Sequence, residues 1–101
     1  MSGVVLVASL AVSDMEGFLR DYAGPLQDIN ARHGVETFAV APQAEMLEGE
    51  AGGMLAILRF PDRAALDAWY ADPDYAPLRA RRQAMSDPDR SFVAIAPETM
   101  T

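Results

Sequence analysis

One helical face in the second half of the chain combines an arginine with aromatic and apolar residues. Its members follow one another at intervals of three and four positions, as on one side of an α-helix: Tyr75, Leu78, Arg82 and Met85. On a packed face, Arg82 must meet an anion or several carbonyl groups, because burying an unpaired charge is very costly. We therefore expect Arg82 to be buried, either in a fold-stabilising contact or as an anchor for a substrate carboxylate or enolate.

Three aromatic residues and the single histidine are the other candidates for a site. Trp69 and Tyr75 are expected to pack in the core or to form the wall of an aromatic pocket. Tyr22, on the apolar face of the first predicted helix, joins them as a candidate ligand contact. His33 lies in the last turn of that helix, where it can interact with the helix dipole, or it can transfer a proton as the one imidazole of the chain.

The composition disfavours several kinds of chemistry. Eight basic residues, all arginine, stand against 15 acidic ones, and the net charge of −7 disfavours binding to nucleic acid. The absence of lysine and cysteine removes Schiff-base lysines, disulfides, thiolate nucleophiles and sulfur-ligated metals. With one histidine, we expect no tightly bound transition metal, no haem and no other cofactor.

The length of 101 residues suits a single domain over residues 1–101. The apolar run Val4 to Val12 is too short to span a bilayer, and it lacks the basic residues and cleavage site of a signal peptide. We therefore expect a cytoplasmic protein with no membrane partner.

The apolar pattern predicts four strands and two helical regions. A capping box, Ser13 to Glu16, begins the first helix, and Gly34 follows its end. Pro25 lies inside this helix and predicts a kink near residues 21–25. Asp62 caps a second helical region, which is interrupted at Pro73 and ends near Met85. The predicted strands are Val4–Val12, Val35–Ala41 (resuming over Ala44–Glu50 after Pro42), Met54–Phe60 and Ser91–Ala96.

The order βαββαβ is typical of the α+β ferredoxin-like fold, or split βαβ arrangement. This fold has a four-stranded antiparallel sheet, and right-handed crossovers place both helical regions on one face. A sheet covered on one face should alternate apolar and polar residues. Three of the strands are instead apolar at almost every position: Val4–Leu10, Met54–Leu58 and Phe92–Ala96. We therefore expect a homodimer, alone or within a larger oligomer, whose sheets face each other.

The sequence from Leu47 to Ala84 resembles the DUF1330 family. The matching residues are Leu47-Glu48-Gly49, Phe60-Pro61, Trp69-Tyr70, Pro73, Tyr75 and Arg82-Gln83-Ala84, and the spacing is kept throughout. Two positions depart from the family pattern. Arg59 stands where a glutamate is usual, and Ala41 to Ala44 replace a glycine-rich stretch. We expect Arg59 to pair with Asp62 or Glu50, or to reach a dimer interface.

The resemblance implies a dimeric α+β barrel, a superfamily that includes cofactor-independent monooxygenases, muconolactone-type isomerases and small binding proteins. It also makes Glu48 the favoured partner for Arg82 and a candidate ligand contact. Two functions remain open. One is a cofactor-independent oxygenase or isomerase for a small acidic or aromatic molecule, with His33, Tyr75 and Arg82 as candidate catalytic residues. The other is a non-catalytic small-molecule-binding or assembly module.

Overall fold

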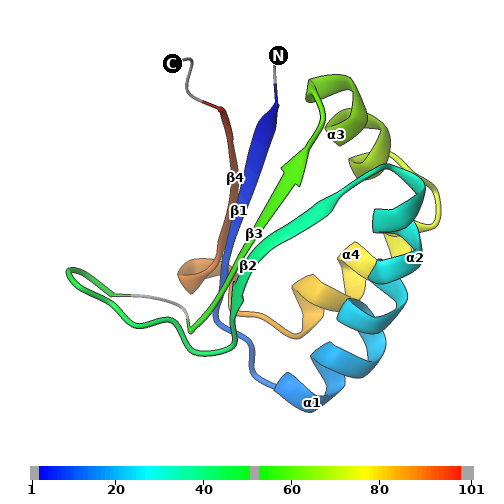
Figure 1. Ribbon diagram of the computed structural model, residues 1–101. Coiled ribbons are helices and arrows are strands. Elements are labelled where there is room, and N and C mark those ends of the chain that lie inside the picture. Colours follow the sequence, from blue (N-terminus) through cyan, green and yellow to red (C-terminus); the bar gives the residue numbers. More distant parts are fainter. Residues whose placement is uncertain (1–2, 51–52, 99–101) are drawn as a thin grey trace.

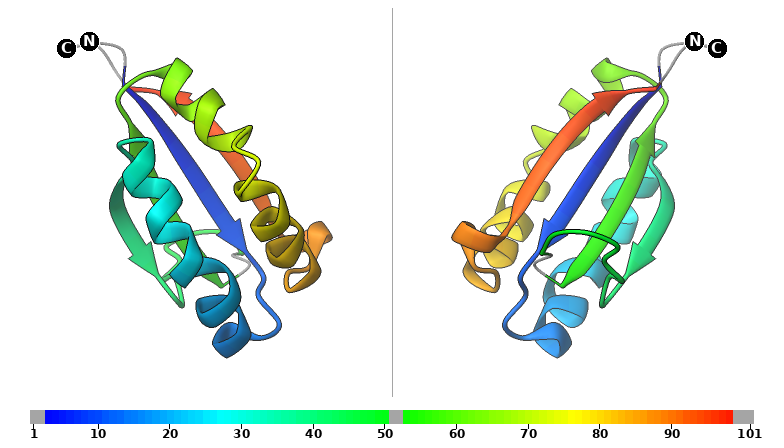
Figure 2. Two further views of the ribbon diagram at one scale, coloured as in Figure 1. Left: turned by 90° about the vertical axis from the view of Figure 1, so that its right-hand side faces the viewer. Right: turned by 90° about the vertical axis from the view of Figure 1, so that its left-hand side faces the viewer.

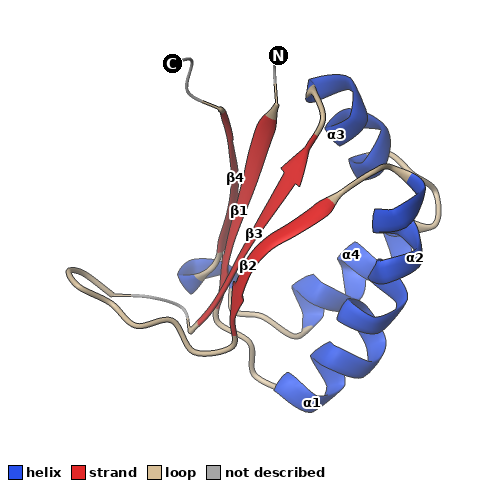
Figure 3. Cartoon of the chain, viewed as in Figure 1, coloured by secondary structure: helices blue, strands red, loops and turns tan. Residues whose placement is uncertain are grey.

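The computed structural model describes residues 3–50 and 53–98, which form an antiparallel sheet with helices on one face (Figure 1, Figure 3). The strands are β1 (Val4–Leu10), β2 (Glu36–Ala41), β3 (Met54–Phe60) and β4 (Phe92–Pro97). The helices are α1 (Met15–Phe18), α2 (Gly24–Arg32), α3 (Arg63–Tyr70) and α4 (Tyr75–Ala84). A π-helical turn (Leu19–Ala23) joins α1 to α2, and a 3₁₀ turn (Pro88–Arg90) precedes β4.

The strand order is β2-β3-β1-β4, and every neighbouring pair is antiparallel. With the element order βαββαβ, this is the predicted ferredoxin-like topology. Both helical regions lie on the same side of the sheet, and Figure 2 shows them crossing it side by side. The α+β fold class, the antiparallel sheet and the one-sided placement of the helices are therefore confirmed.

The helix-covered face of the sheet holds the core. Leu6, Ala8 and Leu10 of β1 are buried there, and their partners on β3 in the antiparallel register are Leu58, Ala56 and Met54. The helices bury large side chains against them: Phe18, Leu26, Ile29, Leu66 and Trp69. Each such side chain contributes about 1.5–3 kcal/mol by leaving water, so this face fixes the position of the helices.

The opposite face of the sheet is apolar, and no helix among the described residues covers it (Figure 2). Val5 and Val7 point to this side, because alternate residues of β1 face the core. Their cross-strand partners, Arg59 and Ile57, share that face. Phe92, opposite Ser9 at the start of β4, is 55% exposed there. We call this surface the open face.

The connection between β2 and β3 is a long arm rather than a resumed strand. Residues 42–50 carry no strand, so the predicted extension over Ala44–Glu50 is wrong. Pro42 cannot donate to a strand ladder, and Gly49 turns the chain with a φ of +82°. The irregularity in β2 lies earlier, where the register with β3 shifts between Thr37 and Ala39. Figure 1 shows the arm projecting on the side of the sheet away from the helices.

The first helical region begins and bends differently from the predicted pattern. The Asp14 carboxylate, not the Ser13 hydroxyl, caps α1 by accepting from the Gly17 amide at 2.9 Å. Ser13 instead donates its hydroxyl to the Met85 carbonyl. The predicted irregularity near Pro25 takes the form of the π-helical turn, closed by the Gly24 N–H on the Leu19 carbonyl. Such turns widen a helix locally and often lie at functional sites.

Candidate functional site

A cavity of about 200 Å³ lies between the helices and the covered face of the sheet. Its floor is apolar, formed by alternate residues of β1 and β3 such as Ala8 and Leu58. The π-helical turn contributes Tyr22, while Trp69 and Tyr75 come from α3 and α4. Three of the predicted ligand contacts therefore line one cavity, together with Arg82 from the last turns of α4.

Two tyrosine hydroxyls meet in the cavity wall. The hydroxyl oxygens of Tyr22 and Tyr75 are 2.9 Å apart, and both side chains are buried. Burial raises the pKa of the Tyr22 phenol far above its ordinary value, with a further contribution from Tyr75, while the positive charge of Arg82 opposes the shift. Tyr22 therefore stays protonated at neutral pH. One hydroxyl donates to the other, which leaves the second hydroxyl hydrogen for a ligand.

Trp69 is fixed by packing and by one hydrogen bond. Its side chain is 1% exposed, and its ring meets that of Phe60 edge to face, with the centroids 5.3 Å apart. The indole N–H donates to the Asn30 side-chain oxygen at 2.8 Å. Trp69 is therefore a core residue that also lines the cavity.

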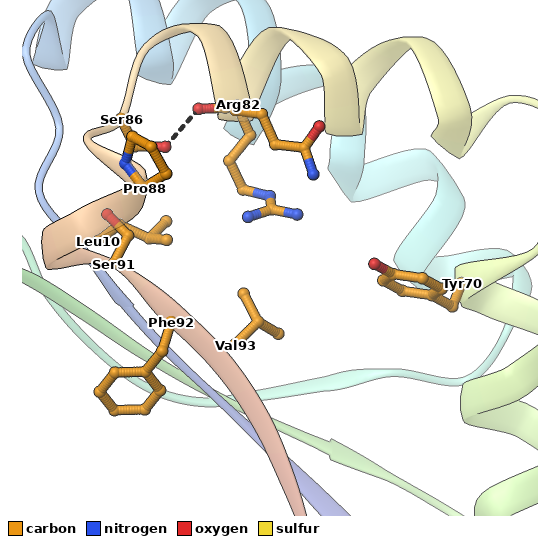
Figure 4. Close-up of a pocket in the computed structure, with 9 residues that line it drawn as sticks. Leu10, Tyr70, Arg82, Ser86, Pro88, Ser91, Phe92 and Val93 are labelled. Atoms are coloured by element: carbon orange, nitrogen blue, oxygen red, sulfur yellow. Dashed lines mark hydrogen bonds between the residues drawn. The ribbon is translucent and has the colours of Figure 1, made fainter.

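Arg82 is buried, as its helical register predicts. The residue is 8% exposed, and its neighbours Tyr75 and Leu78 on the same helical face are buried with it. Its guanidinium carbon lies 6.0 Å from the centre of the Tyr22 ring. Figure 4 shows the guanidinium extending from α4 towards Val93 of β4, in a pocket next to the cavity.

The predicted pair between Arg82 and Glu48 does not form. Glu48 is exposed on the arm between β2 and β3, which projects away from the helices. Within residues 3–50 and 53–98, no carboxylate lies within 4 Å of the Arg82 guanidinium, and its buried Nε has no hydrogen-bond partner. The prediction failed because the arm is a loop, so no strand carries Glu48 back to the core.

The electrostatic surroundings of Arg82 favour an anion in the cavity. No aspartate or glutamate is among the described residues that line the cavity, although the chain carries a net charge of −7. A buried guanidinium in an apolar, carboxylate-free wall attracts anions more strongly than it would in water. The arrangement can therefore hold a small acid with its carboxylate or enolate oxygen on Arg82.

His33 lies outside this cavity, at the end of α2. Its Nε2 is 2.8 Å from the carboxylate of Asp72, which also accepts from Arg32 at 2.7 Å. The hydrogen bond from His33, followed by that from the Asp74 backbone amide, lowers the pKa of Asp72 below its ordinary value. This cluster ties the C-terminus of α2 to the turn between α3 and α4. His33 and Glu48 are thus the two predicted site residues that the fold does not bring to the cavity.

Arg59 lies on the open face and has different partners from those expected. Its guanidinium contacts Glu98 at 3.1 Å and Glu36 at 3.6 Å, so the predicted pairs with Asp62 and Glu50 are wrong. It also lies 5.3 Å from the centre of the Phe38 ring. Glu36 is directly opposite Arg59 in the register of β2 and β3, whereas Glu98 follows the end of β4.

Neither a metal site nor a membrane-spanning helix is found in the described part of the chain. No group of three or more histidine, cysteine, aspartate or glutamate side chains there is arranged to hold a metal ion. None of the helices over residues 3–50 and 53–98 is both long and apolar enough to cross a bilayer.

The family model described as "Domain of unknown function (DUF1330)" matches residues 4–96. The chain belongs to this family. The match spans all four strands and all the helices, so the DUF1330 resemblance is confirmed. A comparison with curated proteins finds none that matches this DUF1330 chain.

Solved structures share the fold of the DUF1330 protein at low sequence identity. A protein of unknown function from Rhodopseudomonas palustris has a TM-score of 0.80 at 15% identity, covering 99% of this chain and 85% of its own. A dimeric ferredoxin-like protein of unknown function from Jannaschia sp. CCS1 has a TM-score of 0.78 at 18% identity, covering 93% and 97%. A mutant of SnoaB, a cofactor-independent oxygenase from Streptomyces nogalater, has a TM-score of 0.70 at 19% identity, covering 98% and 95%. These likenesses show the fold alone.

The sequence analysis of the DUF1330 protein did not identify two buried polar residues, Asn30 and Asp72. Asn30 accepts a hydrogen bond from Trp69, which lies 39 positions further along the chain. The sequence of α2 gives no sign that this asparagine is buried. Asp72 stands before a proline, where a turn role is the usual interpretation, and its contact with His33 depends on how α2 packs.

Proposed function

We propose that this protein binds a small organic anion in the cavity between the helices and the sheet, with Arg82 as the anchor for its carboxylate or enolate. The observation that carries the proposal is the combination of burial and missing partners at Arg82. A charged side chain that is 8% exposed ordinarily has a carboxylate or several carbonyls beside it. Among the described residues Arg82 has neither, and the adjoining space is a cavity.

The size and lining of the cavity support a single-ring ligand. A cavity of about 150 Å³ accommodates benzene, and the cavity here measures about 200 Å³. Its apolar floor suits a ring, while the free hydroxyl hydrogen of the Tyr22–Tyr75 pair suits one acceptor atom on the ligand. The ligand class is therefore a compact aromatic or alicyclic acid, with the ring on the sheet and the acid group on Arg82.

The test compares an acid with its uncharged isostere. We expect phenylacetate to bind with measurable heat in isothermal titration calorimetry at 0.15 M salt, and phenylacetamide to bind at least about tenfold more weakly. Arg82→Met should abolish the preference for the acid. Arg81→Met, one position along α4 and exposed, changes the net charge equally and serves as the control. Equal binding of both probes, or an intact preference in Arg82→Met, contradicts the proposal.

A second candidate is proton transfer on such an acid without a cofactor, as in an oxygenase or isomerase. Two observations favour it: the fold is shared with a cofactor-independent oxygenase at a TM-score of 0.70, and a tyrosine hydroxyl pair stands beside a buried arginine. Arg82 would stabilise a developing enolate, Tyr75 would donate a proton to its oxygen, and solvent water would take the carbon-bound proton. His33 is held by Asp72 outside the cavity, which favours Tyr75 over His33 for this role.

Hydrogen exchange separates the two candidates. The C3 protons of phenylpyruvate exchange with deuterium oxide through its enol, and proton NMR follows the rate. An enzyme of this type accelerates the exchange, and Tyr75→Phe removes the acceleration while phenylacetate binding persists. A binding module leaves the uncatalysed rate unchanged.

We also propose that the protein forms a homodimer through the open face. Val7, Ile57 and Phe92 form an uncovered apolar surface there, and a ferredoxin-like protein of the same fold is described as dimeric. A second copy presents the same apolar face, so the contact is self-complementary about a two-fold axis. Ile57→Glu should convert a dimer to a monomer in sedimentation velocity, whereas Ala64→Glu, exposed at the start of α3, should not. A wild-type monomer at micromolar concentration contradicts the proposal.

A further inference from the structure

A second pocket, of about 250 Å³, lies on the other side of Arg82 from the cavity. It is bounded by the end of α4, the 3₁₀ turn and the start of β4 (Figure 4). Leu10, Arg82 and Val93 line both spaces, so the two spaces adjoin at these residues. We call the two spaces the inner cavity and the outer pocket.

The outer pocket gathers donors that have no partner within the described chain. The Tyr70 hydroxyl and the Gln83 amide line it beside the Arg82 guanidinium, and neither makes a side-chain hydrogen bond to the described residues. Figure 4 shows the Tyr70 hydroxyl directed towards the space that the guanidinium faces. Arg79 adds positive charge at the rim, with its guanidinium carbon 4.7 Å from the centre of the Tyr70 ring.

The hydroxyls of the two serines in the pocket are already used to hold its walls. The Ser86 hydroxyl donates to the Arg82 carbonyl at 2.6 Å, which closes the last turn of α4. The Ser91 hydroxyl accepts from the Ala11 amide at 2.9 Å, which fixes the start of β4 against the end of β1. No aspartate or glutamate lines the outer pocket within the described residues. The Arg82 guanidinium is a cation, and the Tyr70 hydroxyl and the Gln83 amide can each donate a hydrogen bond, so these groups can hold an anion.

We propose that the outer pocket holds a second carboxylate of the same ligand, which makes the ligand class a compact ring-bearing dicarboxylic acid. The inference deepens the proposed function and rests on it, because both carboxylates use Arg82. A guanidinium has five N–H donors, and a bidentate carboxylate occupies two of them. Donors remain for a second carboxylate on the outer side, where Tyr70 and Gln83 complete its hydrogen bonds.

The test uses two acids that differ by one carboxylate. Phenylsuccinate is phenylacetate with a carboxymethyl group on the carbon next to the ring. We expect wild-type protein to bind one enantiomer of phenylsuccinate at least about tenfold more tightly than phenylacetate, because the added carboxylate accepts charge-assisted hydrogen bonds in the outer pocket. The monoamide of the added carboxylate keeps its size and should lose the gain. Titrations at 0.15 M salt keep the long-range repulsion from the acidic chain small.

Variants of the outer pocket assign the gain to its donors. In the double variant Tyr70→Phe with Gln83→Leu, the affinities for phenylsuccinate and phenylacetate should differ by less than about threefold, because both hydrogen bonds to the second carboxylate are lost. Phenylacetate affinity should stay unchanged, because neither residue lines the inner cavity. Both side chains are exposed, so the fold tolerates the changes, and an unchanged circular dichroism spectrum checks this.

The outcomes separate the two proposals. If wild-type protein binds neither acid, the proposed function and the outer carboxylate site are both wrong. If phenylacetate binds and phenylsuccinate binds no better, or if the double variant keeps the wild-type ratio, the outer site is wrong and the proposed function stands.

Discussion

One arginine lies on each side of the sheet, Arg59 on β3 and Arg82 on α4, and the more exposed of the two is the one with carboxylate partners. Arg59, on the open face, has Glu98 and Glu36 within 4 Å although it is only half-buried. Arg82, on the covered face, is 8% exposed and has no carboxylate beside it in the described chain. The surface pair contributes little, whereas the buried charge lacks compensation where its desolvation costs most.

The contrast indicates what could cover the open face and what could compensate the charge of Arg82. The open face presents a broad apolar surface, which a second copy of the chain would cover. The covered face is closed by its own helices and retains a cavity beside one unsatisfied cation. Under the proposed function, the buried charge of Arg82 lowers the stability of the free protein and is compensated by a bound anion, in keeping with the usual trade between stability and function.

The largest expected effect comes from truncating a core aromatic on the covered face. Trp69→Ala should lower the free energy of unfolding by about 3–5 kcal/mol, because it empties a fully buried site and leaves the Asn30 side chain without its donor. Phe92→Ala on the open face should cost less than about 1 kcal/mol in the monomer, since its ring is 55% exposed. Urea unfolding at one low protein concentration measures both. Equal losses would remove the distinction between the faces.

A smaller effect is expected from acid, at the cluster of Asp72, His33 and Arg32. The folded pKa of Asp72 lies below that of the unfolded chain, so its contribution to stability is fully present above about pH 4. The contribution is lost as the pH falls through the folded pKa of Asp72. The reason is that the Asp72 carboxylate takes up a proton at a higher pH in the unfolded chain than in the folded protein. Asp72→Asn should therefore flatten the fall in melting temperature between pH 4 and pH 2. A variant with the same acid profile as wild type would show that the ion cluster does not contribute.

The smallest effect is expected at the paired arginine. Arg59→Met should change the free energy of unfolding by less than about 1 kcal/mol, because exposed ion pairs contribute little and its aliphatic part is replaced. Raising the salt concentration should reduce even this difference. A loss of several kcal/mol in urea unfolding would mean that the open-face pair is a main support of the sheet.

Periodicity was sufficient for the fold and for the burial of Arg82. Apolar runs and turn residues place the strands, and the three-and-four spacing after Pro73 puts Arg82 on the packed face with Tyr75. These are local properties of the chain, which sequence patterns report directly. The Asp62 cap of α3 and the left-handed Gly34 are local in the same sense, and both are confirmed.

The contacts between distant residues were not predictable in the same way. The sequence favours Glu48 as the partner of Arg82. The position of the Glu48 side chain depends, however, on the path of the arm between β2 and β3. The Tyr22–Tyr75 pair joins residues 53 positions apart, and it depends on the π-helical turn that rotates Tyr22 within the first helical region. Ser13 and Asp14 are adjacent and both suit a helix cap, and the Met85 carbonyl decides between them.

The most direct test of the role of Arg82 is a pair of thermal melts of wild type and Arg82→Met, with and without saturating phenylacetate. Without ligand, Arg82→Met should melt higher, because it removes an unsatisfied buried group whose cost is about 1 kcal/mol or more. With phenylacetate, wild type should rise by several degrees, as mass action requires of a ligand that binds the folded state, and the variant should not move. If Arg82→Met melts lower without ligand and phenylacetate shifts neither protein, Arg82 is a structural residue and the account is wrong.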